Sequence, residues 1–128
     1  MKEWTIIYRP HYSAWFGKCG EELQNEILAH IEVLKTLGPN LGRPRVDHIK
    51  GSVHQNMKEL RVQFKGDPVR ILFAFDPDRR AVLLLGGAKT GDDRWYRKNV
   101  PLADQEFDLH LLEMQKEKKK HKHKEKKQ

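Results

Sequence analysis

Hydrophobic and polar residues follow two different periods along this chain, and the periods separate a helix from strands. Across residues 21–37 the apolar positions recur every three or four residues, which places them on one face of a helix. Those positions are Leu23, Ile27, Ile31 and Leu34. Glu21 and Glu22 suit the positive end of the helix dipole, and Gly38-Pro39 is typical of a helix stop. The segment therefore predicts a helix that covers a hydrophobic core.

Short apolar runs bounded by turn residues predict four strands. The first run, residues 4–9, ends at Pro10, and residues 11–18 after it are predicted to form one or two helical turns. The other three runs occupy residues 58–64, 69–75 and 81–85. Their connections, KGDP and DPDRR, have turn chemistry, so these runs predict a meander of antiparallel strands.

Two polar stretches are predicted to be loops. Residues 40–56 contain two glycines and a proline, and long loops of this kind are often functional. Residues 88–99 follow the Gly-Gly pair that ends the last apolar run. Pro101 is then predicted to open a final helix, because its missing N–H costs nothing at the first helical position.

The final helix presents an apolar stripe and ends in a Lys-rich segment. The stripe consists of Ala103, Phe107, Leu111 and Met114. The like charges of residues 116–128 predict a disordered tail after at most about one further turn. Residues 1–115 are then a single domain of α+β class, in which N-terminal helices and a C-terminal helix pack on one face of a small antiparallel sheet.

Composition restricts the class of protein. No apolar run approaches the roughly 20 residues that a membrane-spanning helix needs, and the start of the chain lacks the apolar core of a signal peptide. A single cysteine, Cys19, allows no internal disulfide. We therefore expect a cytoplasmic protein without a membrane partner. No paired carboxylates, Ser-His-Asp set or Gly-rich phosphate loop suggests another kind of enzyme.

The net charge of +7 comes mainly from the tail, where residues 116–128 contain eight Lys and two Glu. The rest of the chain is nearly neutral but uneven, because residues 43–99 hold thirteen basic and seven acidic side chains. Clustered cations gain affinity for polyanions by releasing counterions from phosphates. A basic middle segment is thus a first indication of a nucleic-acid partner.

Candidate chemistry lies on the predicted strands. If Gly66-Asp67 is the tip of the hairpin, Gln63 lies opposite Arg70, and Arg61 is a diagonal neighbour of Arg70 on the same face. Arg61 and Arg70 could instead be ordinary arginines on a solvated sheet face. The following loop alternates cations with Trp95 and Tyr96, as an RNA-binding rim does, although the rings could instead cover the edge of the core.

These residues also carry a resemblance to a known family. The stretch NMKELRVQFKGDPVRILFAFDPDRRAVLLLGGAKTGDDRWYRKNVPLADQEFDLHL and the upstream LGRPRVDHIKGS resemble RelE/HigB-like toxins of type II toxin–antitoxin modules, particularly the phage-derived HigB-like branch. The resemblance covers roughly residues 4–114. It implies a RelE-like fold and a metal-independent endoribonuclease that needs no cofactor. It also implies that the substrate is mRNA, commonly on the ribosome, and that the partner is a HigA-like, helix-turn-helix antitoxin.

The resemblance further implies roles for individual residues. Arg61, Arg70, Lys89 and Tyr96 match catalytic positions of the family, and Trp95 could take the place of Tyr96. Gln63 stands where RelE has a second lysine on the strand, which departs from the family pattern. Tyr96 is expected to stack on a base or to exchange a proton with the 2′-hydroxyl, with its pKa lowered by the neighbouring cations. The expected RNA-binding residues are Arg43, Arg45, Lys50, His54, Lys58, Lys65, Arg94, Trp95 and Lys98. Among them, His54 could supply what HigB-type members obtain from a histidine.

Other functions stay open at this point. One is a ParE-like inhibitor of DNA gyrase that is not a nuclease, and another is a non-catalytic module that binds RNA or the ribosome. The tail could be attracted to ribosomal RNA or could be a passive solubilising segment. Its His121 and His123 could in principle bind a metal, but we expect no metal site in this protein.

Overall fold

The computed structural model describes residues 2–89 and 93–126, with side chains up to residue 121. It contains five strands and three α-helices within the described residues. In chain order these are β1 (Thr5–Tyr8), α1 (Pro10–Lys18), α2 (Glu21–Leu37), β2 (Val46–His48), β3 (Lys58–Phe64), β4 (Asp67–Phe75), β5 (Arg80–Ala88) and α3 (Arg94–Lys126). A 3-10 turn, Gly38–Asn40, follows α2. The α+β class expected from the sequence is confirmed.

The strands form one sheet in the order β1-β5-β4-β3-β2. β1 pairs with β5 in parallel, and the three other pairings are antiparallel. The meander of β3, β4 and β5 is therefore confirmed. The sequence missed β2, a strand of three residues within the expected 40–56 loop, which forms by pairing with β3.

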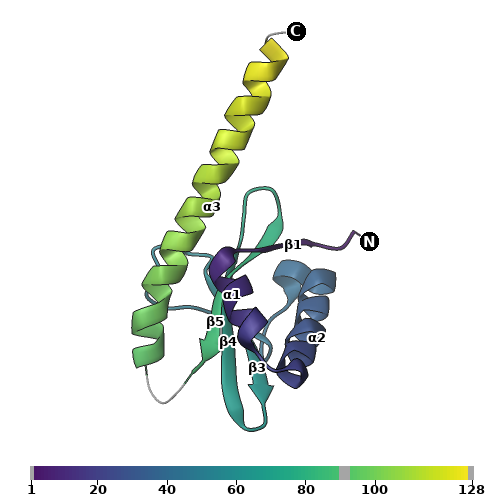
Figure 1. Cartoon of the computed structure of the whole chain (residues 1–128), viewed down its shortest axis with the longest axis vertical. Helices are drawn as coiled ribbons and strands as arrows, with labels where there is room; N and C mark the ends of the chain where they lie inside the picture. The colour runs from purple at the N-terminus through teal and green to yellow at the C-terminus, as the bar shows by residue number, and fades with distance from the viewer. Residues whose placement is uncertain (1, 90–92, 127–128) are drawn as a thin grey trace.

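Helices cover both faces of the sheet, which corrects the expectation that they share one face. The core on one face combines α2 residues such as Ile27 and Leu34 with Phe73 of β4. The core on the other face combines Phe107 of α3 with Leu84 of β5. Figure 1 shows α1 and α2 on one side of the strands and α3 along the other. The central strands β4 and β5 are accordingly apolar on both faces, as sandwiched strands must be.

The β3–β4 hairpin turns at Lys65-Gly66, one residue earlier than the sequence suggested. Both residues have positive φ, 50° and 83°, as a two-residue type I′ turn requires. The register that follows pairs Arg61 directly with Arg70 and Gln63 with Pro68. The expected diagonal placement of the arginines was wrong, but their shared face is confirmed, because directly opposite residues point to the same side.

Two glycines at the end of β5 admit tryptophan rings from opposite sides of the sheet. A Cβ atom at Gly86 would collide with the ring of Trp15 of α1, and one at Gly87 would press on the indole of Trp95 of α3. The glycines lie within β5, which runs to Ala88 rather than ending at residue 85. They permit both helices to approach the strand closely.

The last helix begins earlier and extends further than the sequence indicated. α3 starts at Arg94, so Pro101 lies inside the helix and does not open it. Trp95 and Tyr96, expected in a loop, occupy its first turn and pack on the core. The helix continues to Lys126 and projects beyond the sheet (Figure 1), where the sequence suggested a disordered tail. None of the described helices is both long enough and apolar enough to cross a membrane.

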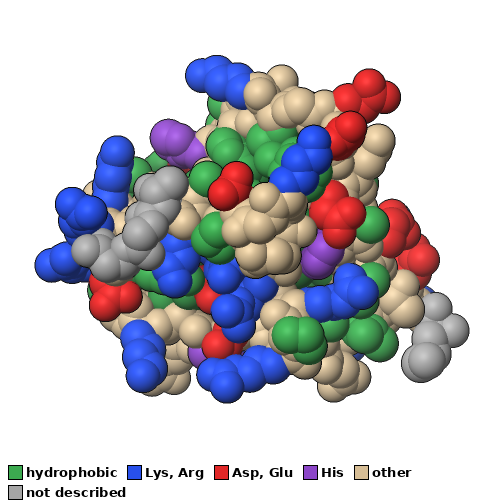
Figure 2. Space-filling view, turned by 90° about the horizontal axis from the view of Figure 1, so that it is seen from below, with side chains coloured by type: hydrophobic (Ala, Val, Ile, Leu, Met, Phe, Trp, Pro, Cys, Tyr) green, Lys and Arg blue, Asp and Glu red, His purple; other side chains and the backbone are tan. Residues whose placement is uncertain are grey.

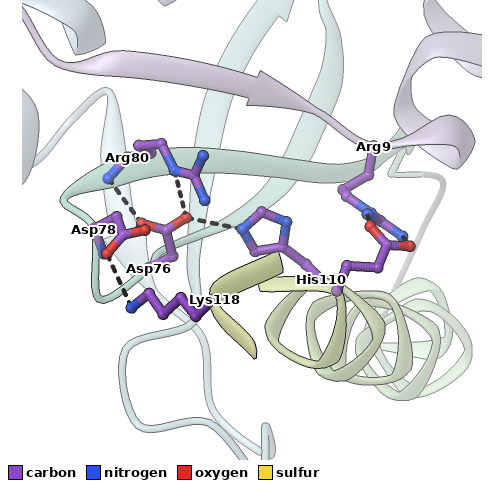
Figure 3. Close-up of polar contacts among 7 residues, drawn as sticks. Arg9, Asp76, Asp78, Arg80, His110 and Lys118 are labelled. Carbon is purple, nitrogen blue, oxygen red and sulfur yellow. Dashed lines mark hydrogen bonds and ion pairs between the residues drawn. The ribbon is translucent and has the colours of Figure 1, made fainter. Parts of the chain in front are cut away.

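A polar network fixes the middle of α3 to the β4–β5 hairpin (Figure 3). The Asp76 carboxylate, whose side chain is fully buried, accepts a hydrogen bond from Arg80 Nε at 2.9 Å and lies 2.8 Å from His110 Nε2. Nearby, Arg9 pairs with Glu106 and Glu113 of α3 at 2.7 and 2.6 Å. Apart from the local Asp76–Arg80 pair, these contacts join residues that are far apart along the chain and that no local pattern indicates.

Candidate active site

Arg61 and Arg70 form the centre of the candidate site, on the sheet face that α3 covers. They lie directly opposite each other on β3 and β4. Arg70 is only 5% exposed, whereas the side chain of Arg61 is 38% exposed. One Nη of Arg70 donates to the carbonyl oxygen of Val69 at 3.1 Å. Its Nε finds no hydrogen-bond partner among the described residues. A buried, positively charged N–H group without a hydrogen-bond acceptor favours the binding of an anion.

Glu59 faces both arginines and is the main site residue that the sequence reasoning missed. Its Oε1 lies 3.7 Å from Arg61 Nε and 3.8 Å from Arg70 Nε, too far for a hydrogen bond but close enough for an ion pair. The carboxylate is buried, with 6% of the residue exposed. The spacing in E-L-R was the available signal, because residues two apart on a strand share a face.

Tyr96 and Lys89 complete the cluster. The Tyr96 hydroxyl donates a hydrogen bond to Glu59 Oε2 at 2.6 Å, and Lys89 Nζ lies 5.1 Å from the centre of the Tyr96 ring. The structure therefore brings together Arg61, Arg70, Lys89 and Tyr96, the four residues expected to be catalytic, with Glu59 between them.

The expected lowering of the Tyr96 pKa was wrong. Burial, reinforced by the hydrogen bond to the Glu59 carboxylate, raises the pKa of Tyr96 to about 12. Arg70 acts in the opposite direction, but its effect is smaller. Near neutral pH the phenol is thus protonated and acts as a hydrogen-bond donor rather than as a base.

Two clefts open on either side of this cluster. The larger one, of about 600 Å³, contains Glu59 and Tyr96 and extends between the 48–51 segment and the first turns of α3. The other, of about 450 Å³, contains Arg61, Arg70 and Gln63. A chain of phosphates could thus reach the arginines from either side.

Some of the expected RNA-binding residues lie beside these clefts. Lys50 lines the larger cleft, and Arg45 lines the smaller one. Arg94 and Lys98 are exposed on the first turns of α3. Trp95 packs against Gly87 and its ring meets Tyr96 edge-on, so it covers the edge of the core.

Other expected RNA-binding residues lie apart from the cluster. His54 is bound to α3, with Nε2 2.8 Å from Asp108 Oδ1. Lys58 points to the opposite face of the sheet, where its Nζ lies 5.3 Å from the centre of the Phe75 ring. Lys65 pairs with Glu22 at the hairpin tip, and Arg43 pairs with Asp47. The structure therefore does not bring His54, Lys58 and Lys65 to the arginine pair, whereas the Asp47 carboxylate that binds Arg43 also interacts with Arg61.

The surface at this end of the molecule has a basic and an acidic side. Figure 2 shows Lys and Arg side chains grouped mainly on the left, whereas Asp and Glu side chains gather mainly on the right. Among the described residues, no group of three or more His, Cys, Asp or Glu side chains is placed to hold a metal ion. The arginine pair and the Tyr96 hydroxyl offer hydrogen-bond donors and positive charge that can be directed at an anion.

Comparison with known proteins identifies the family. The sequence model of the family described as "Phage derived protein Gp49-like" matches residues 14–108. HigB3 of Mycobacterium tuberculosis (strain ATCC 25618 / H37Rv), named as a toxin, is 46% identical over 102 residues, which are 79% of this chain and 88% of that protein. The chain belongs to the Gp49-like, HigB-like toxin family. The resemblance seen in the sequence is thereby confirmed.

A further HigB-like relative differs in length. HigB2 of the same organism, also named as a toxin, is 46% identical over 105 residues, or 80% of this chain. The chain spans only about half of that protein, 52% of its length. The family match includes the whole arginine cluster, whereas β1 and the Lys-rich end of α3 lie outside it.

Proposed function

We propose that this HigB-like protein is the toxin of a toxin–antitoxin pair and that it inhibits translation by cleaving mRNA. The observation that carries the proposal is the arrangement of Arg61 opposite Arg70, with Tyr96 and Lys89 beside them. Two guanidinium groups on neighbouring strands can contact the same backbone phosphate. The family membership supports the toxin role, and an mRNA substrate implies a toxin that acts in the cytoplasm.

The proposed reaction is metal-independent transesterification. The 2′-hydroxyl of RNA attacks the adjacent phosphorus, a new P–O2′ bond forms, and the P–O5′ bond breaks. The 2′-hydroxyl proton passes to solvent water, and the departing 5′-oxygen takes a proton from solvent water. Arg70 and Arg61 stabilise the charge that develops on the phosphate oxygens, Lys89 adds to their field, and Tyr96 donates a hydrogen bond as a neutral phenol.

The partners follow from the same proposal. A HigA-like, helix-turn-helix antitoxin neutralises the toxin by covering the basic face or by displacing α3. The mRNA is cleaved while bound to the ribosome, where its bases are held single-stranded and accessible. The arginines, the basic surface around them and the two clefts support binding of such a substrate.

The test is expression of the wild type and of Arg61→Ala and Arg70→Ala variants in cells that lack the antitoxin. One lost charge-assisted contact of about 1.5–3 kcal/mol slows cleavage by roughly 10- to 150-fold. We expect growth arrest and new mRNA ends, mapped by primer extension, with the wild type and a loss of both with the variants. Because Arg70 is buried, thermal unfolding shows whether that variant folds, and the more exposed Arg61 gives an independent result.

The alternatives predict different outcomes. Growth arrest with intact mRNA and altered DNA supercoiling would indicate a ParE-like inhibitor of gyrase. An absence of toxicity, with RNA or ribosome binding retained, would indicate a non-catalytic module. Either result would refute the nuclease proposal.

A further inference from the structure

The smaller cleft contains a histidine that the proposed mechanism does not use. His30 of α2 lines this cleft together with Arg61 and Arg70. Although α2 packs on the opposite face of the sheet, His30 reaches the cleft because β2 pairs with β3 only as far as Leu60, so the following residues of β3 lie at the sheet edge. A phosphate bound to the two arginines and the ribose attached to it therefore share one cleft of about 450 Å³ with the imidazole.

The ring of His30 is held in one orientation and one tautomer. Its side chain is only 13% exposed, and its Nδ1 lies 2.9 Å from the carbonyl oxygen of Glu26, one helical turn earlier. A carbonyl oxygen can only accept a hydrogen bond, so Nδ1 carries the proton of the neutral ring and Nε2 carries the lone pair. Within the described part of the chain, the polar contacts of His30 are with Glu26 and involve Nδ1, which leaves Nε2 available to accept a proton.

His30 is the most suitable proton acceptor among the described residues of this cleft. The three arginines that line it stay protonated, and the Gln63 amide is neutral and not basic. The carboxylate of Glu26 is the alternative, but its Oε1 lies 3.8 Å from His30 Nδ1. In that position the carboxylate stabilises the positive charge that the ring gains when Nε2 takes up a proton.

We propose that His30 is the general base of the cleavage reaction and takes the 2′-hydroxyl proton through Nε2. This inference rests on the proposed function, since it assigns a step of the same reaction. As O2′ bonds to phosphorus and the P–O5′ bond breaks, the proton moves from O2′ to Nε2, and the departing 5′-oxygen takes a proton from water. The imidazolium then releases its proton to water, which restores the starting tautomer. Imidazole suits this step because it gains and loses protons near neutral pH.

The first test separates the chemical step from binding. Ribosomes programmed with a short mRNA are mixed with excess protein, and the rate of a single turnover is measured for the wild type and for His30→Gln. We expect the saturating rate to fall about 100-fold or more, as loss of a general base does, with affinity for a 2′-deoxy mRNA within about twofold of the wild type. The retained affinity also shows that the variant is folded. A wild-type rate, or a loss of affinity that accounts for slower cleavage, would overturn the inference.

Two further variants are matched to His30→Gln. His11→Gln removes an exposed histidine that follows β1, at the sheet edge opposite β2, and whose Nε2 lies 3.7 Å from Glu106. It should cleave at the wild-type rate. Glu26→Gln removes only the neighbouring carboxylate, which is 46% exposed, and should slow cleavage no more than about fivefold. A larger loss in Glu26→Gln than in His30→Gln would make the carboxylate the base and overturn the assignment.

The second test distinguishes a general base from a general acid. Sulfur in place of the bridging 5′-oxygen departs as a thiolate that needs no proton, so loss of a general acid has little effect on such a substrate. We expect His30→Gln to slow cleavage of this 5′-thio mRNA by the same factor as cleavage of the ordinary mRNA. Recovery of the wild-type rate with the 5′-thio mRNA would assign His30 to the leaving group and refute its role as the base.

The outcomes separate this inference from the proposed function. If the wild type cleaves mRNA and His30→Gln cleaves it equally fast, the assignment of the base fails alone and the nuclease proposal stands. If the folded wild type binds programmed ribosomes and cleaves no mRNA, the nuclease proposal fails and the assignment of His30 fails with it.

Discussion

At the scale of single residues, a buried carboxylate facing two guanidinium groups has opposing effects on an anionic ligand. Glu59 neutralises part of the positive charge of Arg61 and Arg70 in the free protein. Its own negative charge lies next to the position that a phosphate bound to the arginines would occupy. At 3.8 Å from Glu59 Oε1, the Nε of Arg70 has no hydrogen bond among the described residues. We therefore expect Glu59 to weaken phosphate binding rather than to assist it.

The Glu59→Gln variant tests this expectation. Removal of one negative charge next to the phosphate site should strengthen binding of a non-cleavable RNA about tenfold, which corresponds to roughly 1.4 kcal/mol. Fluorescence anisotropy with a labelled 2′-deoxy oligonucleotide measures the change. Glu106→Gln, another buried carboxylate paired with an arginine, is the control and should leave RNA affinity unaltered. Weaker binding by Glu59→Gln would show that the carboxylate positions the arginines.

Individual site residues were predicted correctly where side-chain type and the alternation of side chains along a strand were enough to identify them. Arg61, Arg70, Lys89 and Tyr96 were named from the sequence together with the family resemblance, and the structure brings them together. His54, Lys58 and Lys65 were also chosen for their side-chain type, yet each has a partner elsewhere, because burial and pairing depend on neighbours that composition does not specify.

At the scale of elements, the contact between α3 and the β4–β5 hairpin depends on one buried carboxylate. Burial by itself acts to raise the pKa of Asp76. Hydrogen bonds from His110 and from the backbone and guanidinium of Arg80 outweigh it, so the pKa lies below the usual range. A carboxyl group with a lowered pKa in the folded state stabilises the fold above its unfolded pKa of about 3.9. That contribution is lost as the pH falls through the folded-state pKa.

Asp76→Asn should destabilise the domain by about 3 kcal/mol at neutral pH, because it removes one partner of a buried charged network. The difference in free energy of unfolding between variant and wild type should shrink as the pH falls below about 4, because the wild-type carboxyl becomes protonated and loses its charge. Urea unfolding at a series of pH values measures both effects. Asp78→Asn is the control, since Asp78 pairs with Lys118 at the surface and should cost little. A pH-independent difference would contradict the electrostatic explanation.

Element boundaries were predicted well where the signals are local. The bounds of α2 and β3 agree with the sequence expectation, because hydrophobic period and stop signals lie within those segments. The start of α3 was missed because Trp95 and Tyr96 become helical by packing on β5 and Glu59. β2 was missed because a strand of three residues exists only through its partner.

At the scale of the whole molecule, positive charge is present at both ends of α3. Tyr96 lies near the start of the helix and the Lys-rich segment lies at its end, about 35 Å away at 1.5 Å per residue. Lys116, Lys119 and Lys120 are exposed side chains of this Lys-rich segment. One RNA strand in the clefts would not reach these lysines unless it were long.

Truncation after residue 115 should therefore separate the two regions. We expect the truncated protein to bind a pentanucleotide with unchanged affinity. For a single-stranded RNA of about 40 nucleotides, the slope of log binding constant against log salt concentration should become smaller by about 3, which corresponds to roughly four lost phosphate contacts. A variant with Lys118, Lys119 and Lys120 all changed to Arg keeps the charge and should retain the full slope. An unchanged slope in the truncated protein would mean that the tail is passive.

The sequence by itself determined the α+β class, the central strands and α2, and the arginines expected to bind phosphate. Hydrophobic period, turn residues and side-chain chemistry are properties of short segments, and the family resemblance rests on an ordered set of them. Only the tertiary structure decided that helices cover both faces, that Arg61 lies directly opposite Arg70, and that Glu59 lies between them. Those facts depend on a hairpin register and on contacts between distant segments, which are set by packing of the whole chain rather than by local preference.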